Sequence, residues 1–129
     1  MRTIYVASAL ENAKACQELA LRLSHDGHKI VSAWHAGNDV DLRTSDEKLT
    51  DVEREKIATD AHQNQNLVRA NTLIVLYDTR CRSTLYEVGV SFALGQRVVI
   101  VGEKSKVPTM LAQRGIIFVT KTTEVEKYL

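Results

Sequence analysis

The stretch Leu73-Ile74-Val75-Leu76-Tyr77, which runs on into Asp78-Thr79-Arg80-Cys81-Arg82-Ser83-Thr84-Leu85-Tyr86-Glu87-Val88-Gly89, decides the fold class of this chain. The apolar run predicts a buried strand, the polar residues predict a loop, and the residues after them predict a helix with Glu87 in its first turn. In parallel α/β proteins, ligands bind where such strands end. The stretch therefore predicts both a fold class and the position of a site.

Short apolar runs alternate with helical patterns along the rest of the chain. The expected strands are Thr3–Ala7, Lys29–Trp34, Thr72–Tyr77, Arg97–Val101 and Gly115–Val119. The expected helices are Asn12–Asp26, Asp51–Ala70, Thr84–Leu94, Val107–Gln113 and Thr122–Leu129, with Gly27, Gly95 and Gly115 as stop signals. This alternation predicts an α/β, flavodoxin-like (Rossmann-like), doubly wound five-stranded parallel sheet in the order 2-1-3-4-5.

Length and composition favour a single domain over residues 1–129. Seventeen basic and sixteen acidic residues leave a formal charge of +1, which argues against a nucleic-acid or membrane partner and favours a small molecule. The two cysteines have neither zinc spacing nor a disulfide framework, and no apolar run approaches the ~20 residues of a membrane helix. We therefore expect a cytoplasmic protein without a metal or an organic cofactor.

The strand order brings two loops together. The sheet reverses between its first and third strands, which puts Ala7-Ser8-Ala9 beside the segment from Asp78 to Glu87. The long irregular stretch from His35 to Thr50 predicts a flap, since loops of this length in compact domains are often functional. A plain surface excursion is an equally good interpretation of that stretch.

Glu87 has two interpretations. Thr84 with Glu87, like Ser8 with Glu11, has the Ser/Thr-x-x-Glu spacing of a helix capping box. Alternatively, a helix N-terminus favours an ionised carboxylate, which over a cleft could attack an anomeric carbon and form a covalent glycosyl intermediate. The pattern alone leaves both interpretations open.

Other polar residues are candidates to complete the site. Tyr5 is either a core aromatic or a hydroxyl partner of Glu87. Arg80, Arg82 and Ser83 are either solvated or bind a phosphate through charge-assisted hydrogen bonds. Of the four histidines, which have no metal-ligand spacing, only His35 is expected near the site.

Asp60 and Asn64 are expected on the inward face of their helix, at ~100° per residue. A carboxylate that faces a sheet needs a partner or a purpose. Asp60 could therefore exchange a proton with a nucleobase, with Asn64 as a further contact, or it could form a structural salt bridge with Arg69 or Arg97.

Several segments, in this order and spacing, resemble the nucleoside 2-deoxyribosyltransferase family, including its relatives that hydrolyse nucleotide N-glycosidic bonds. The segments are Ile4-Tyr5-Val6-Ala7-Ser8, Gly27-His28-Lys29-Ile30-Val31, Arg69-Ala70-Asn71-Thr72-Leu73-Ile74-Val75, Tyr86-Glu87-Val88-Gly89-Val90-Ser91-Phe92-Ala93-Leu94-Gly95-Gln96 and Val101-Gly102. The resemblance covers nearly the whole chain.

The resemblance implies a role for each matching residue. Glu87 matches the nucleophile, Tyr5 the tyrosine that positions it, and Ser8 the turn that faces the sugar or its phosphate. The family's base-contacting acid falls on Gln63 here, and Asp60 one turn earlier is the candidate substitute. The departure at Gln63 also allows a protein that binds its ligand without turnover.

Two further features separate this chain from the family pattern. The position six residues before the nucleophile is Cys81, where transferases of the family tend to carry aspartate and nucleotide hydrolases serine. The absence of that aspartate, together with Arg80, Arg82 and Ser83, favours a 5′-phosphorylated ligand. Ser83-Thr84 replaces a glycine pair of the family, which limits how closely the backbone approaches a phosphate. The resemblance also implies a homo-oligomer in which a neighbour completes each site through Thr109, and less securely through Ser105 and Met110.

Together these observations predict cleavage or transfer of an N-glycosidic bond of a nucleoside or a nucleoside 5′-monophosphate. The alternative from a different class is a non-catalytic nucleotide-binding module, a sensor or sponge, motivated by Gln63 and Cys81.

Overall fold

The computed structural model describes residues 1–36, 66–111 and 115–129. Its centre is a five-stranded, all-parallel sheet in the order β2-β1-β3-β4-β5, which confirms the predicted doubly wound α/β fold. The strands are β1 (Thr3–Ser8), β2 (Lys29–Ile30), β3 (Thr72–Leu76), β4 (Arg97–Val101) and β5 (Ile117–Val119).

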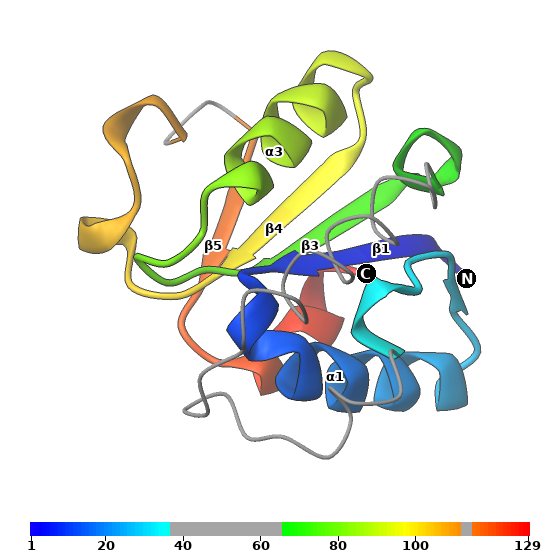
Figure 1. Cartoon of the computed structure of the whole chain (residues 1–129). Coiled ribbons are helices and arrows are strands. Elements are labelled where there is room, and N and C mark those ends of the chain that lie inside the picture. The colour runs from blue at the N-terminus through cyan, green and yellow to red at the C-terminus, as the bar shows by residue number, and fades with distance from the viewer. Residues whose placement is uncertain (37–65, 112–114) are drawn as a thin grey trace.

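Helices cover both faces of the sheet (Figure 1). Helix α1 (Ala13–His25) lies on one face, and α3 (Ser83–Ala93) lies on the other. The 3-10 segments are η1 (Leu10–Asn12), η2 (Trp34–Ala36), η3 (Asn66–Arg69), η4 (Lys104–Lys106), η5 (Thr109–Leu111) and η6 (Thr122–Tyr128). Arg22 in α1 ties η6 to the same face, because its Nε donates to Glu126 Oε1 at 2.7 Å.

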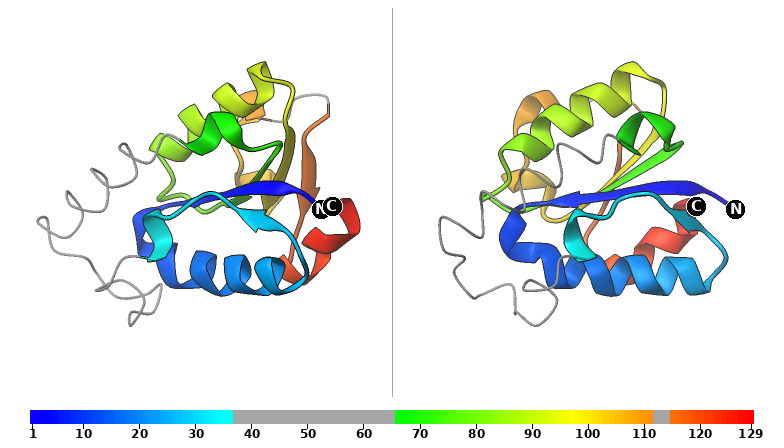
Figure 2. Two further views of the ribbon diagram at one scale, coloured as in Figure 1. Left: turned by 90° about the vertical axis from the view of Figure 1, so that its right-hand side faces the viewer. Right: turned by 45° about the vertical axis from the view of Figure 1, so that its right-hand side comes forward.

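The core lies between the sheet and these helices. Every residue of β3 is buried, as expected of a central parallel strand that is covered on both faces. Helix α1 contributes Cys16, Leu19 and Leu23 from its inner face, which is the amphipathic pattern that the sequence predicted. The two chain ends lie on the same side of the molecule (Figure 2), where Arg2 Nε donates to the carbonyl oxygen of Leu129 at 3.1 Å.

Strand β2 is shorter than predicted, because side chains replace its last backbone contacts with β1. The strand ends at Ile30 rather than at Trp34. Beyond it, the amide of Val6 donates to Ser32 Oγ at 3.0 Å, and Trp34 Nε1 donates to the carbonyl oxygen of Val6 at 2.8 Å. Both backbone groups of Val6 are thus satisfied without a pairing partner in β2.

Three expected helices also differ in the structure. The segment predicted as Val107–Gln113 forms a 3-10 turn at Thr109–Leu111, with residues 112–114 outside the described part. The C-terminal segment is a 3-10 helix rather than an α-helix. Of the helix predicted from Asp51 to Ala70, only the end is described, as the 3-10 turn Asn66–Arg69.

Glycines end α1 and α3 as predicted. Gly27 after α1 and Gly95 after α3 have φ values of 96° and 71°, a region that residues with a Cβ rarely adopt. In each case the next amide donates back to a carbonyl of the helix: His28 to Leu23 and Gln96 to Ser91. Within the described ranges, no helix has the length and apolar character needed to cross a membrane.

Candidate functional site

The candidate site lies at the carboxyl ends of β1 and β3. The two strands are neighbours, and Ser8 pairs with Leu76 at their last register position. After this point the chain leaves β1 towards α1 on one face and leaves β3 towards α3 on the other (Figure 1). This is the topological switch point at which open α/β sheets bind ligands, and the sequence predicted it correctly.

Glu87 and Tyr5 meet on the α3 side of the sheet. Tyr5 lies in the middle of β1 and is 4% exposed, and Glu87 is half-buried in α3. Burial raises the pKa of Glu87 to about 7, against a hydrogen bond from Tyr5 that lowers it. The pKa of the Tyr5 hydroxyl is raised by burial and then by the charge of Glu87, so Tyr5 stays protonated and acts as the donor.

The capping-box interpretation of Glu87 is wrong. Helix α3 begins at Ser83 with Arg82 as its N-cap, and this N-cap makes no side-chain capping hydrogen bond. Glu87 is the fifth helical residue, beyond the first turn in which it was expected. Thr84, its supposed capping partner, is 1% exposed, and its hydroxyl has no hydrogen-bond partner among the described residues. Tyr5, rather than the free amides of the helix, is therefore the hydrogen-bond partner of the Glu87 carboxylate.

Ser8 does not form its predicted capping box either. The segment that follows it, η1, starts from Ala9 without a side-chain cap. The Ser8 hydroxyl instead donates to the carbonyl oxygen of Leu76, which joins the ends of β1 and β3. Ala7 belongs to the strand and is fully buried in the core, and its contact with a ligand stays a prediction.

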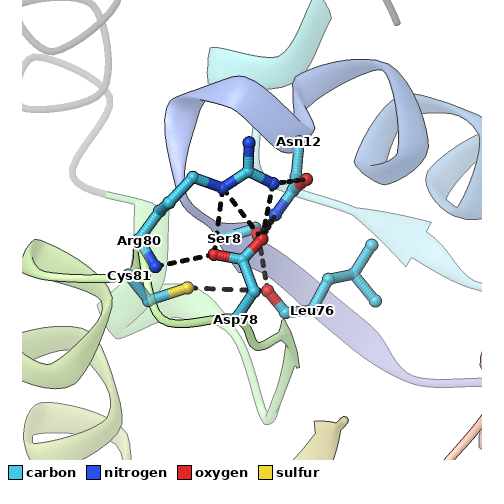
Figure 3. A network of polar contacts seen from close by, with 6 residues as sticks. All are labelled: Ser8, Asn12, Leu76, Asp78, Arg80 and Cys81. Carbon is cyan, nitrogen blue, oxygen red and sulfur yellow. Dashed lines mark hydrogen bonds and ion pairs between the residues drawn. The ribbon is translucent and has the colours of Figure 1, made fainter. Parts of the chain in front are cut away.

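A polar network connects the two loops at this edge (Figure 3). Asn12 Nδ2 donates to Ser8 Oγ at 2.9 Å and to Asp78 Oδ2 at 2.7 Å. Arg80 Nη2 donates to Asp78 Oδ2 at 2.7 Å and to Asn12 Oδ1 at 3.0 Å. The sequence prediction included Ser8, Asp78 and Arg80 but missed Asn12. Its position four residues after Ser8, just beyond the end of a strand, was the available signal.

Asp78 keeps its negative charge in this network. Partial burial acts to raise the pKa of its carboxyl group, but hydrogen bonds from Arg80 and Asn12 outweigh burial and lower it. The backbone amide of Arg80 also donates to Asp78 Oδ1 at 2.8 Å. The loop after β3 therefore carries an ionised carboxylate, Asp78, that forms an ion pair with Arg80 of the same loop.

The two cysteines lie beneath the site. Cys81 is 5% exposed, and its thiol donates to the carbonyl oxygen of Leu76 at 3.6 Å. Cys16 is fully buried, and burial raises the pKa of its thiol; the interactions of that thiol with Cys81 and Glu87 act in the same direction, whereas a hydrogen bond with Ser8 opposes them. Ser8, Cys81 and Glu87 thus all lie close enough to the Cys16 thiol to affect its pKa. The Cys81 thiol is turned towards the protein interior, and its contact with a ligand stays a prediction.

His35, which was expected near the site, lies in the protein interior, and its contact with a ligand stays a prediction. It is 2% exposed, with Nε2 2.7 Å from Ser32 Oγ and Nδ1 2.7 Å from Gln17 Oε1. Ser32 Oγ accepts a hydrogen bond from the Val6 amide, so we assign its own hydroxyl as the donor to an unprotonated His35 Nε2. The proton of the neutral ring is then on Nδ1, which donates to Gln17 Oε1. Burial lowers the pKa of His35 to about 4, in agreement with a neutral ring.

The remaining predicted residues are only partly described. Ser83 is exposed at the start of α3, and Thr109 is exposed in η5. Asp60, Gln63 and Asn64 lie outside the described residues, as does most of the predicted flap. In the part of the chain that the structure describes, no three His, Cys, Asp or Glu side chains are grouped to hold a metal ion.

Comparison with known structures finds the same fold in an enzyme. The structure is that of a 2-deoxyribosyltransferase from the psychrotolerant bacterium Bacillus psychrosaccharolyticus, described as a biocatalyst for nucleoside synthesis. The two chains are 16% identical, with a TM-score of 0.60 over 98% of this chain and 92% of the other. No protein-family model matches the sequence, and no curated protein is significantly similar to it. The structural likeness shows the fold.

Proposed function

We propose that this protein cleaves or transfers the N-glycosidic bond of a nucleoside or a nucleoside 5′-monophosphate, with Glu87 as the nucleophile. The observation that carries the proposal is the partly buried Glu87 carboxylate, hydrogen-bonded to Tyr5 beside the switch point. The shared fold with a 2-deoxyribosyltransferase supports it. Small-molecule nucleosides or nucleotides are the proposed ligands, and no metal or organic cofactor takes part.

The proposed reaction has two displacements at the anomeric carbon C1′. A carboxylate oxygen of Glu87 forms a bond to C1′ while the bond from C1′ to the base nitrogen breaks, and the electron pair leaves with the base. A proton from the base side neutralises the leaving group. Water or a second base then attacks C1′, gives up a proton to the group that protonated the first base, and returns the carboxylate, which gives hydrolysis or transfer.

The environment of Glu87 suits the first displacement. An ionised carboxylate is destabilised by burial, whereas the glycosyl ester that it forms is neutral. Desolvation therefore favours ester formation, while the Tyr5 hydroxyl keeps the carboxylate oriented and partly ionised. With a pKa of about 7, a large fraction of Glu87 is ionised at neutral pH.

The other roles in the proposal come from the sequence. Asp60 is the proposed proton donor to the base, with Gln63 and Asn64 as further base contacts. Exposed Ser83 is a proposed contact to the sugar or its phosphate. We further propose a cytoplasmic homo-oligomer in which the exposed Thr109 reaches the neighbouring site.

A non-catalytic nucleotide-binding module is the second candidate. The observation in its favour is Cys81, which occupies the position of a ligand-contacting residue but donates to Leu76 inside the protein. A module of this kind would bind nucleotides without releasing base.

Chromatography of free base tests the two candidates. Purified protein is incubated with a panel of nucleosides and 5′-monophosphates, with and without an acceptor base, beside the Glu87→Ala and Glu87→Gln variants. We expect base release or exchange that falls by at least roughly 10³-fold in both variants. The control is Glu18→Gln, an exposed carboxylate of α1. Ligand binding without base release from any substrate would favour the binding module.

A further inference from the structure

We infer that the ion pair between Asp78 and Arg80 makes this site select an uncharged nucleoside over the corresponding 5′-monophosphate. The inference rests on the proposed function, since it concerns the substrate of the same site. It reverses the expectation from sequence, in which Arg80, Arg82 and Ser83 leaned towards a phosphorylated ligand. The reason lies in what the Arg80 guanidinium already binds.

Arg80 is held by partners from two segments that are far apart in the sequence. Its Nη2 lies 2.7 Å from Asp78 Oδ2 and 3.0 Å from Asn12 Oδ1. Its Nε lies 3.2 Å and 3.3 Å from the two carboxylate oxygens of Asp78. A phosphate at Arg80 therefore has to compete with a carboxylate that already forms charge-assisted hydrogen bonds to the same guanidinium.

Asp78 is itself fixed in place. Besides Arg80, it accepts from Asn12 Nδ2 at 2.7 Å and from the Arg80 amide at 2.8 Å. Asn12 is buried and is tied in turn to Ser8 at the end of β1 (Figure 3). If Arg80 turned towards a phosphate, the Asp78 carboxylate would stay behind, close to a second negative group, and like charges at such distances repel.

The rest of the loop does not offset this repulsion. From residue 78 to residue 87 the chain has two carboxylates, Asp78 and Glu87, and two arginines, Arg80 and Arg82. A phosphate would add about two negative charges to a stretch whose formal charges already balance once Glu87 is ionised. The uncapped start of α3 favours anions, but the nearby Thr84 hydroxyl is buried and offers no accessible donor to a ligand.

The test compares a nucleoside with its own 5′-monophosphate on the wild-type protein and on Asp78→Asn. Two readouts are compared at equal ionic strength, first at low salt and then with added salt: kcat/KM for base release, and Kd by isothermal titration calorimetry. Asp26→Asn is the matched control, because it removes the same charge from an exposed residue after α1, at the opposite edge of the sheet. We expect the wild type to prefer the nucleoside by about tenfold or more, equivalent to ~1.4 kcal/mol per factor of ten.

In Asp78→Asn, this preference should shrink by at least about tenfold or invert, and added salt should weaken it in the wild type. A wild type that prefers the monophosphate, or a folded Asp78→Asn variant with an unchanged ratio, overturns the inference. If Asp78→Asn does not fold, the preference of the wild type for nucleoside over monophosphate decides the inference. A second measurement is inhibition of nucleoside turnover by the monophosphate, which should be weak.

The two proposals can fail separately. If the wild type binds the nucleoside more tightly than its monophosphate but releases no base, the glycosyl chemistry fails and the selectivity stands. If base release depends on Glu87 but prefers the monophosphate, the glycosyl chemistry stands and the selectivity fails. Binding of neither ligand overturns both.

Discussion

Tyr5 and Glu87 come from distant parts of the sequence, one from the middle of β1 and one from the second turn of α3, and they share a hydrogen bond. The pairing exists because β1 and β3 are neighbours in the sheet, so the helix that follows β3 packs back over β1. The phenol stays protonated, and its hydrogen bond lowers the pKa of the carboxyl group against the effect of burial.

Replacing Tyr5 with Phe should move the acid limb of the pH–activity profile to higher pH. The hydrogen bond from Tyr5 lowers the pKa of Glu87, and its loss raises that pKa further above about 7. Less of the carboxylate is then ionised at neutral pH, so activity at pH 7 should fall by ~10-fold or more. The measurement is kcat/KM for base release between pH 5 and pH 9.

Tyr86→Phe is the control for this experiment, because Tyr86 is 75% exposed and lies beside Glu87 in sequence. It removes the same hydroxyl group from the solvent side of α3. An equal shift of the profile in both variants would contradict the assigned pairing.

Glu87→Gln should stabilise the fold at alkaline pH while it removes activity. The folded-state pKa of about 7 is above the unfolded value of 4.5. The wild type therefore has its full contribution from this group below pH 4.5 and loses it as pH rises through 7. Glutamine does not ionise, so its free energy of unfolding does not change in this way. The difference in unfolding free energy, variant minus wild type, should therefore be ~2–3 kcal/mol larger at pH 8 than at pH 4. Urea unfolding at both pH values measures this, and Glu18→Gln should show no such gain.

The sequence predicted the sheet well because its strands are continuous apolar runs between clear stop signals. It also predicted the edge at which the segments of Ser8 and Asp78 come together, since parallel topology alone brings those loops together. It overestimated β2 because Ser32 and Trp34 fit a strand pattern, while their side chains bond to the backbone of Val6. Such side-chain substitution for backbone pairing leaves no periodic signal.

Local spacing also misled the prediction at α3. Thr84 and Glu87 have capping-box spacing, yet the helix starts one residue before Thr84, which moves Glu87 out of capping reach and towards Tyr5. The ion pair of Asp78 with Arg80 likewise depends on loop geometry, since the same residues in an open loop could bind a phosphate. Helix starts and loop conformations are set by tertiary contacts that one sequence does not display.

The buried His35 should make the fold sensitive to acid. Its pKa is about 4 in the folded state and 6.5 when unfolded, because burial disfavours the charged ring. Between these values the unfolded chain binds more protons, so the contribution of His35 is complete above pH 6.5 and is lost as pH falls through 4. The loss should total ~3 kcal/mol. His35→Gln should reduce this pH dependence in urea unfolding, whereas the exposed His25→Gln should not.

Two glycines should respond in opposite ways to substitution by alanine. Gly102 follows β4 with a φ of 154°, and a Cβ there would meet the carbonyl oxygen of Tyr77 at 3.0 Å. Gly102→Ala should therefore destabilise the fold by ~1–3 kcal/mol and disturb the backbone next to Asp78.

Gly89 is exposed in the middle of α3, and a Cβ added there would meet no atom of the described residues within 4 Å. Gly89→Ala should stabilise the fold by ~0.5–1 kcal/mol, because alanine loses less backbone entropy in a helix. Urea midpoints of the two variants measure both effects, and a loss of stability in Gly89→Ala would indicate that the exposed face of α3 packs against another surface in solution.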